Sequence, residues 1–293
     1  MRTKPARAGL SLAVEVAEDY EAMSRRAEQL IVTNLRRRPR LLLCASAGGT
    51  PTRLYQLLAA RRQDEPRLFD RLRVLQIDEW GGLPPAHPAT CDEDLRVKLV
   101  APLRLSHDRY VSFRTDASDP EAECQRVAEW LAQNGPIDLC ILGLGLNGHV
   151  AMNEPAAAIT PEIHVAKLAR GSLNHAMLQN LERKPTYGLT LGLRDILSSR
   201  QILLLVNGQK KQKALGRLLR PQVTTRFPAS FLWLHSDATV LCDRASMPEF
   251  SPISPASGSS PRTPNGIISP VKRRRAQRSS SPNQNATLLA YEK

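Results

Sequence analysis

The sequence lacks an uninterrupted apolar run of about 18 residues, the length that a membrane-spanning helix needs. We therefore expect no transmembrane segment and no membrane association. The first ten residues, MRTKPARAGL, are basic, but the apolar stretch after them is short and soon interrupted by acids. This pattern indicates the start of a folded domain rather than a signal peptide.

The sequence also lacks a Cys-x-x-Cys pair. It has five Cys residues, an odd number, and no two of them have that spacing. That spacing would have indicated a zinc site or a redox motif. Cys44 and Cys140 lie within apolar runs, where a thiol is usually a small core residue. We therefore expect no metal site at the cysteines and a reducing, cytoplasmic location.

Two common nucleotide-binding motifs are missing too. The segment SAGGTP at 46–51 is not a Walker A loop, because no Gly-Lys-Ser/Thr follows it. Gly143, Gly145 and Gly148 have the spacing of a dinucleotide fingerprint, but His149 stands where its helix should begin. No acidic residue ends a strand about 20 residues later, so the fingerprint is incomplete.

Positive charge is what the chain has in excess: 41 Lys and Arg residues against 28 Asp and Glu give a net charge of +13. Residues 243–293 hold eight of the basic and three of the acidic residues, and the remaining excess is scattered. A basic, solvated surface explains this distribution. The alternative is a surface that attracts anionic substrates or nucleic acid, although the scattered charge argues against a nucleic-acid partner.

Apolar runs alternate with amphipathic stretches from about residue 18 to 242. The runs predict strands at 40–45, 73–77, 137–142, 201–206 and 239–242. The amphipathic stretches predict helices at 19–37, 50–62, 119–133 and 210–219, with Pro51 in the first turn of the second and Asp119 capping the third. Strands that alternate with helices indicate an α/β fold with a parallel sheet and helices on both faces.

The composition changes sharply near residue 243. We expect residues 1–242 to form a single domain. Residues 243–293 are rich in Ser, Pro and Arg, and we expect them to be a disordered tail, because they offer too little apolar surface to offset the entropy of ordering. The basic cluster KRRR at 272–275 is either a localisation or nucleic-acid element or incidental to the tail.

Three polar segments each follow a predicted strand. They are SAGGTP at 46–51, QIDEWGGLP at 76–84 and LGLGLNGHVAMNEP at 142–155. Ligands of open α/β sheets bind at the carboxyl ends of the strands. We therefore expect the three segments to meet and to form parts of one site.

The first segment joins a strand to a helix through Gly48, Gly49 and Thr50. Exposed backbone N–H groups and the start of a helix suit an anion such as phosphate, and the Thr50 hydroxyl could add a donor. A plain tight turn is the alternative. Lys211 follows another predicted strand and either reaches a phosphate as a point charge or is an ordinary solvated lysine.

The second segment carries two adjacent carboxylates, Asp78 and Glu79, which we expect at the end of the second strand. Neighbouring side chains of an extended chain point to opposite sides, so only one of them can readily face a cleft. A carboxylate there could act as a general base on a carbon acid. The alternative is an ordinary acidic strand end.

The third segment sets His149 behind a glycine-rich loop, with Glu154 before a proline. His149 by itself would be a structural histidine by default, but the glycines around it favour a role in proton transfer. His149 and Glu154 alone supply too few ligands for a metal ion.

Together the three segments resemble the glucosamine-6-phosphate deaminase/6-phosphogluconolactonase superfamily over about residues 15–242. GLGLNGHVAMNEP is similar to the deaminase signature, and its Asn-Glu-Pro element distinguishes it from the lactonases. PASFLWLHSD at 228–237 resembles the galactosamine-6-phosphate deaminase/isomerase branch. The resemblance implies a three-layer α/β/α sandwich with a modified Rossmann-like, mostly parallel sheet. It also implies that no redox cofactor or catalytic metal is required.

The resemblance further implies a reaction and a set of roles. The substrate would be a small-molecule hexosamine 6-phosphate, converted to a ketohexose 6-phosphate with loss of ammonia, and the enzyme would be an isomerase and a hydrolase. Asp78 would move a proton between C2 and C1, and His149 with Glu154 would assist opening of the sugar ring. The 6-phosphate would be held by Gly48, Gly49, Thr50 and Lys211.

The chain departs from the glucosamine enzymes at three positions. Asn147 stands where they often carry Asp, which puts a ring-opening role of that position in doubt because an amide is not a base. Ala47 replaces a hydroxyl residue. The basic phosphate ligand expected near 172–180 has no clear counterpart, and His175 is the candidate substitute.

These inferences give one leading hypothesis and two alternatives. The leading hypothesis is an amino-sugar-phosphate deaminase/isomerase of amino-sugar catabolism that acts on galactosamine 6-phosphate or glucosamine 6-phosphate. One alternative is a phosphosugar lactonase. The other is a non-catalytic sugar-phosphate-binding regulator. The sequence leaves open whether the protein forms a homo-oligomer.

Overall fold

The computed structural model describes residues 12–248 of the 293-residue chain. The last strand, β10, spans Ala238–Asp243, and a 3₁₀ turn follows at Arg244–Ser246. The Asp243 carboxylate accepts hydrogen bonds from the Gly208 N–H at 3.0 Å and the Ser246 N–H at 2.9 Å. Ordered structure therefore continues beyond 242, where the tail was expected to begin. The rest of that expected tail, with its basic cluster at 272–275, lies outside the described residues.

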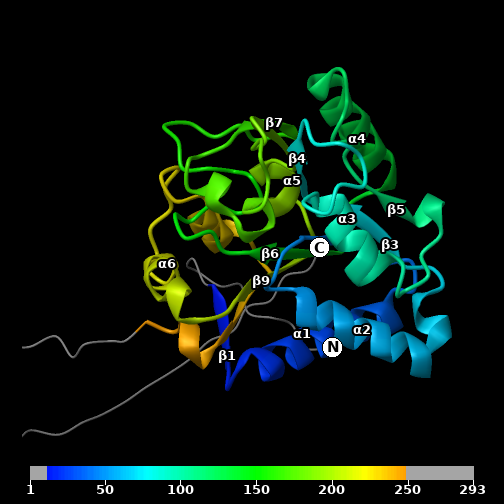
Figure 1. The fold of residues 1–293 in the computed structure, drawn as a ribbon. Coiled ribbons are helices and arrows are strands. Elements are labelled where there is room, and N and C mark those ends of the chain that lie inside the picture. Colours follow the sequence, from blue (N-terminus) through cyan, green and yellow to red (C-terminus); the bar gives the residue numbers. More distant parts are fainter. Residues whose placement is uncertain (1–11, 249–293) are drawn as a thin grey trace, which may run out of the picture. The chain divides into compact units, whose positions relative to one another are not determined.

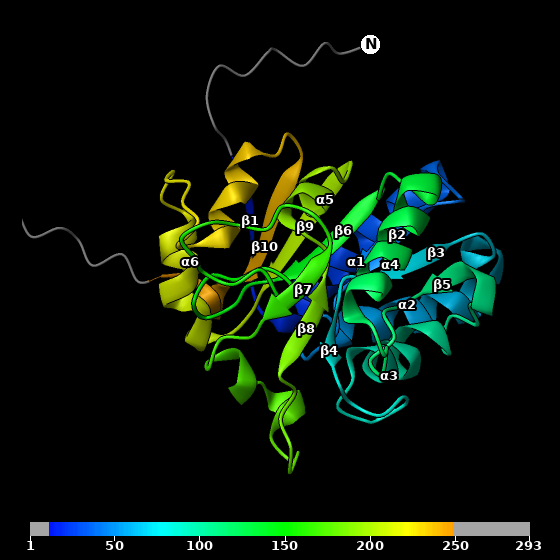
Figure 2. The ribbon, with the colours of Figure 1, turned by 90° about the horizontal axis from the view of Figure 1, so that it is seen from above.

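A seven-stranded sheet forms the centre of the domain. Its strand order is β1-β10-β9-β6-β2-β3-β5, and every neighbouring pair is parallel (Figure 2). The strands are β1 (Ala13–Ala17), β2 (Leu42–Ala45), β3 (Arg73–Gln76), β5 (Tyr110–Val111), β6 (Leu139–Gly143), β9 (Gln201–Val206) and β10. The predicted parallel sheet is thus confirmed, and the edge strands β1 and β5 were not predicted.

Helices cover both faces of this sheet (Figure 1). They are α1 (Tyr20–Arg37), α2 (Thr52–Asp64), α3 (Cys91–Leu95), α4 (Pro120–Asn134), α5 (Leu193–Leu197) and α6 (Gln212–Leu218). Two buried apolar clusters separate the layers: one joins the sheet to α1, α2 and α3, and the other joins it to α4, α5 and α6. The predicted three-layer α/β/α sandwich is therefore confirmed.

Strand β2 illustrates how the sheet serves both layers. Leu42 and Cys44 belong to the cluster with α4, whereas Leu43 and Ala45 belong to the cluster with α1. All four residues are buried, which is why the strand reads as a continuous apolar run.

The helix starts follow capping rules. Asp19 precedes α1 and accepts a hydrogen bond from the Ala22 N–H at 2.7 Å, and Asp119 caps α4 as predicted, accepting from the Glu121 and Ala122 N–H groups. Pro51 was predicted in the first turn of the helix. It lies instead at the residue just before α2, in a helical conformation. Within residues 12–248, no helix combines the length and apolar character needed to cross a membrane.

A second, antiparallel sheet of three strands corrects one prediction. Asp78 does not end the second parallel strand. Strand β3 stops at Gln76, and Asp78 begins β4 (Asp78–Gly81), which pairs with β8 (Tyr187–Thr190), and β8 pairs in turn with β7 (His164–Lys167). Ile77 joins the two sheets: its N–H donates to Ala45 O of the large sheet, and its carbonyl accepts from Leu191 N.

Candidate active site

A cavity of about 420 Å³ opens at the carboxyl ends of β2, β6 and β9. Its walls come from the loops after these strands, from the start of β4 and from the segment between β7 and β8. All nine side chains or glycines singled out in the sequence line it: Gly48, Gly49, Thr50, Asp78, Asn147, His149, Glu154, His175 and Lys211. The structure thus brings the three motif segments together, as expected from their places after parallel strands.

The two adjacent carboxylates point in opposite directions. Asp78 lines the cavity, whereas the Glu79 side chain is buried behind it. Glu79 accepts four hydrogen bonds, from Gln76 Nε2 and from the N–H groups of Trp80, Cys91 and Asp92. Glu79 therefore anchors β4 to the start of α3, and Asp78 is the carboxylate left to face a ligand.

Burial raises the pKa of Asp78 to about 7, and the nearby Glu79 contributes to the rise. A carboxyl group with a pKa near the working pH can both accept and return a proton, which suits a general acid–base catalyst. Asp78 is therefore a carboxyl group that lines the cavity and can change protonation state near neutral pH.

The pH dependence of turnover tests this assignment. A base must be deprotonated to act, so we expect the turnover rate to rise with pH through a midpoint near 7. Steady-state rates between pH 5 and 9 measure this profile. A rate that stays constant down to pH 5 would contradict the assignment.

Glu154 is the centre of a polar cluster beside the glycine-rich loop. Its Oε2 lies 3.4 Å from His149 Nδ1 and accepts a hydrogen bond from Asn147 Nδ2 at 2.8 Å, while its Oε1 accepts one from the Ser172 hydroxyl. Although burial opposes it, these partners lower the pKa of Glu154 to about 2. Glu154 therefore stays ionised at neutral pH, with its Oε2 next to the His149 ring.

Gly145 and Gly148 are needed for this arrangement. A β-carbon on Gly145 would lie 2.5 Å from the His149 ring, so only glycine lets the imidazole pack against the loop. Gly148 has a φ of +92°, and a β-carbon there would lie 2.1 Å from the Phe227 ring. The loop therefore fixes the histidine by close backbone approach.

The predicted phosphate loop offers fewer donors than its sequence suggests. Gly48, at a φ of +102°, gives its N–H to the Asp94 carboxylate at 2.9 Å. The Thr50 hydroxyl donates to Asn207 Oδ1 at 2.8 Å. Among residues 12–248, the backbone N–H groups of Gly49 and Thr50 have no hydrogen-bond partner. These two amides are the donors that the loop presents to an anion.

Two basic side chains face the same part of the cavity. Lys211 Nζ donates to the Leu144 carbonyl, and burial lowers the pKa of its ammonium group. His175 lies near the phosphate loop: a methyl group at Gly48 would sit 3.8 Å from its ring. Burial lowers the pKa of His175, and the charges of His149 and Lys211 add to the effect. A bound anion would favour the charged form of both groups.

Sequence reasoning missed Ser172 and Asp94. Ser172 lies in a 3₁₀ turn between β7 and β8, and Asp94 lies in α3 among other acids. Neither stands in a motif, and both reach the site only through the fold. Within the described part of the chain, no group of three or more His, Cys, Asp or Glu side chains could hold a metal ion.

The fold and the cavity define a class of protein: an α/β sandwich that places two unpaired backbone amides, a carboxylate of raised pKa and a His–Glu pair at one edge of a parallel sheet. The family model "Glucosamine-6-phosphate isomerases/6-phosphogluconolactonase" matches residues 15–241. The chain belongs to this family, which confirms the membership predicted from the three segments.

The chain is similar over most of its length to curated members of the family. It is 40% identical to the protein named "Putative deaminase AgaI" of Escherichia coli (strain K12), over 76% of this chain and 89% of that one. It is 34% identical to the glucosamine-6-phosphate deaminase of Bacillus pumilus (strain SAFR-032), over 78% and 95% of the two chains. The names of both relatives specify deaminases, and neither name supports the hydrolase class.

Solved structures share the fold. A monomeric glucosamine-6-phosphate deaminase superposes with a TM-score of 0.77 at 32% identity, covering 80% of this chain and 98% of the other. The 6-phosphogluconolactonase of Trypanosoma brucei superposes with a TM-score of 0.64 at 21% identity, covering 81% and 98%, which shows a common fold.

Proposed function

We propose that the protein is a hexosamine-6-phosphate deaminase/isomerase whose preferred substrate is galactosamine 6-phosphate. The observation that carries the proposal is one cavity that contains an uncommitted carboxylate, Asp78, a His149–Glu154 pair and the free amides of Gly49 and Thr50. The names of the relatives support the deaminase class.

In the proposed reaction, one group of cavity residues binds the 6-phosphate and another transfers protons. The 6-phosphate binds the Gly49 and Thr50 amides, with Lys211 and His175 as cationic partners. His149, held by Glu154, moves a proton to the ring oxygen and opens the pyranose. Asp78 then takes the C2 proton and returns it to C1, which leaves an imine at C2. Water adds to that carbon and ammonia departs, giving the ketohexose 6-phosphate.

The choice of galactosamine 6-phosphate rests on the segment 228–237. Its resemblance to the galactosamine branch concerns residues next to the site, because the Ala229 N–H donates to the Gly148 carbonyl at 2.8 Å and Phe227 packs on Gly148. The deaminase with 40% identity is also not named for glucosamine. Side-by-side measurement of kcat/KM should give a higher value for galactosamine 6-phosphate, and equal values or a preference for glucosamine 6-phosphate would contradict the choice.

Asn147 gives a prediction about the pH profile. Its amide donates to Glu154 at 2.8 Å, so an aspartate there would set two carboxylates against each other and raise the pKa of Glu154. Since a higher pKa favours protonation of Glu154 at low pH, we expect the turnover of Asn147→Asp, relative to the wild type, to be lower at pH 5 than at pH 8. The His149 N–H already bonds Asn147 Oδ1 at 3.0 Å, a bond that aspartate keeps, so the loop should remain folded. A ratio of variant to wild-type rates that is the same at pH 5 and pH 8 would refute the expectation.

The two alternative functions make different predictions. A lactonase would hydrolyse 6-phosphogluconolactone without releasing ammonia. A tail-dependent regulator would lose salt-sensitive nucleic-acid binding when the tail is removed. Because Asp243 and Ser246 belong to the folded domain, the truncation should remove 249–293 only. We expect the truncated protein to keep its full turnover. A full-length protein without turnover that loses salt-sensitive nucleic-acid affinity on truncation would favour the regulator.

Two further predictions concern the state of the protein. The solved deaminase at 32% identity is described as monomeric, and that relative favours a monomer over a homo-oligomer. Sedimentation velocity distinguishes the two. The cytoplasmic location stays a prediction.

A further inference from the structure

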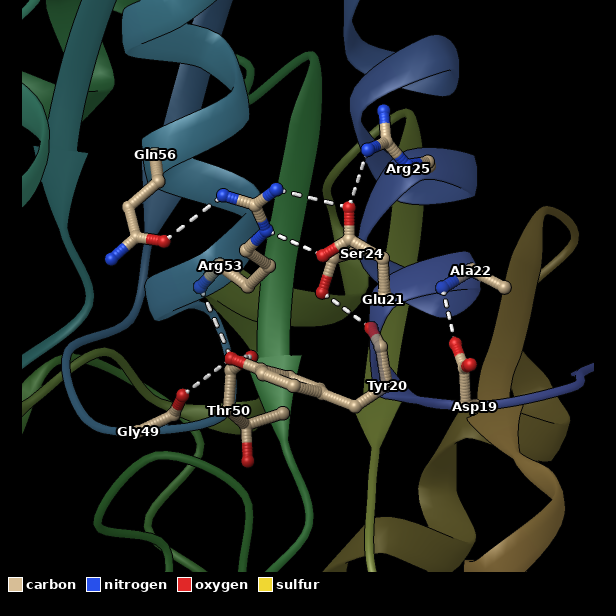
Figure 3. Close-up of polar contacts among 10 residues, drawn as sticks. All are labelled: Asp19, Tyr20, Glu21, Ala22, Ser24, Arg25, Gly49, Thr50, Arg53 and Gln56. Atoms are coloured by element: carbon tan, nitrogen blue, oxygen red, sulfur yellow. Dashed lines mark hydrogen bonds and ion pairs between the residues drawn. The ribbon is translucent and has the colours of Figure 1, made fainter.

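Tyr20 lies behind the phosphate loop, on the side away from the cavity. It is the first residue of α1, and its hydroxyl oxygen lies 2.9 Å from the Gly49 carbonyl and 3.0 Å from the Thr50 carbonyl, which share its single hydrogen (Figure 3). The same hydroxyl accepts a hydrogen bond from the Arg53 N–H at 3.0 Å. Tyr20 therefore joins the two loop carbonyls to the first turn of α2.

The neighbouring amides of the loop are already engaged. The Gly48 N–H bonds to Asp94, the Thr52 N–H bonds to the Gly49 carbonyl at 3.2 Å, and Pro51 has no N–H. The Arg53 N–H, which the first turn of a helix would otherwise leave unpaired, is taken by Tyr20. Tyr20 thus completes the pairing around the Gly49 and Thr50 amides, the two donors that the loop presents to an anion.

The planarity of the peptide bond connects Tyr20 to one of those donors, the Thr50 amide. In a trans peptide the C=O and N–H groups point in opposite directions. The carbonyl of Gly49 and the N–H of Thr50 belong to the same peptide unit, so a carbonyl held toward Tyr20 turns the Thr50 N–H away from it. Gly49 and Thr50 line the cavity whereas Tyr20 does not, so this direction is toward the cavity.

We propose that Tyr20 is a positioning residue for substrate phosphate: its hydroxyl holds the Gly49–Thr50 peptide plane so that the Thr50 amide faces the phosphoryl group. The inference deepens the proposed function and rests on it. Tyr20 does not touch the substrate and takes no part in proton transfer. Its loss should therefore weaken the binding of phosphate and leave the chemical step unchanged.

Glu21, the next residue of α1, supplies a matched control. It also joins α1 to α2, through a hydrogen bond from Arg53 Nη2 at 3.0 Å, but it makes no contact with the loop (Figure 3). Glu21→Gln weakens the contact between the helices without changing the loop hydrogen bonds. Tyr20→Phe keeps the aromatic ring and removes the hydroxyl alone.

The experiment measures kcat and KM for the hexosamine 6-phosphate and the inhibition constant of inorganic phosphate in the wild type and both variants. For Tyr20→Phe we expect KM and the phosphate inhibition constant to rise together by about five- to tenfold, with kcat within about twofold of the wild type. Glu21→Gln should leave all three values within about twofold.

Each other result contradicts a stated part of the account. If Tyr20→Phe lowers kcat with no change in KM, or changes the phosphate constant no more than Glu21→Gln does, the positioning role is wrong and the proposed function stands. If the wild type neither turns over a hexosamine 6-phosphate nor binds inorganic phosphate, the proposed function and the inference both fail.

Discussion

Replacing Asp78 with asparagine is expected to lower the rate of ammonia release by about 10²- to 10⁴-fold, the range that a positioned acid–base group contributes. Asparagine has nearly the same shape but cannot accept the C2 proton. The Asp78 carboxylate is the one in the cavity that no hydrogen bond from residues 12–248 engages. In the proposed reaction Asp78 does not bind the phosphate. The inhibition constant of inorganic phosphate should therefore stay within about twofold of the wild-type value.

A folding measurement separates loss of chemistry from loss of structure. The pKa of Asp78 is about 7 in the folded protein, above the value of about 3.9 for an unfolded chain. Between these values the folded state binds more protons, so Asp78 makes the protein less stable as the pH rises. Denaturant unfolding should show Asp78→Asn to be more stable than the wild type at pH 8 and equally stable at pH 4. Turnover above one tenth of the wild-type rate would rule out Asp78 as the base.

Substitution of Gly145 by alanine is expected to reduce turnover by about 10²-fold or more. The added methyl group would meet the His149 ring at 2.5 Å and push the imidazole away from Glu154. A displacement of about 1 Å in a catalytic group can cost this much. The change acts through the position of the histidine, so the phosphate inhibition constant should be unaffected.

Gly143 provides the control for this substitution. It lies two residues earlier, at the end of β6, and a β-carbon there would meet no atom within 4 Å. Gly143→Ala should therefore keep turnover within about threefold of the wild type, since only the backbone entropy of the unfolded chain changes. Equal losses in the two variants would show that the loop is sensitive to any side chain, and the packing of His149 would not be the cause.

The main sheet and the gathering of the site could be predicted because their signals are local. Buried parallel strands read as apolar runs such as 40–45, and the rule that ligands bind at their carboxyl ends brought Asp78 and His149 into one site. The alternation of side chains also predicted that only one of Asp78 and Glu79 would face the cleft, and the family resemblance identified it as Asp78.

Other features depend on contacts between distant segments. Strands β7 and β8 are four residues each, and β8 pairs antiparallel both with β7 and with β4, which lies about a hundred residues earlier, so nothing local predicted the second sheet. Asp94 accepts a hydrogen bond from the Gly48 N–H, but the sequence CDED at 91–94 contains three acids. The packing of α3 decides which of them points toward Gly48, so the sequence alone could not identify it. The role of Tyr20 likewise depends on the packing of α1 against α2.

The central claim is that this cavity removes nitrogen from a hexosamine 6-phosphate, and the most direct test follows both products. Purified protein is incubated with galactosamine 6-phosphate, and ammonia and ketohexose 6-phosphate are measured together. The account predicts that they form in equal amounts and that Asp78→Asn forms neither. Release of no ammonia from either galactosamine 6-phosphate or glucosamine 6-phosphate, with hydrolysis of 6-phosphogluconolactone instead, would contradict it.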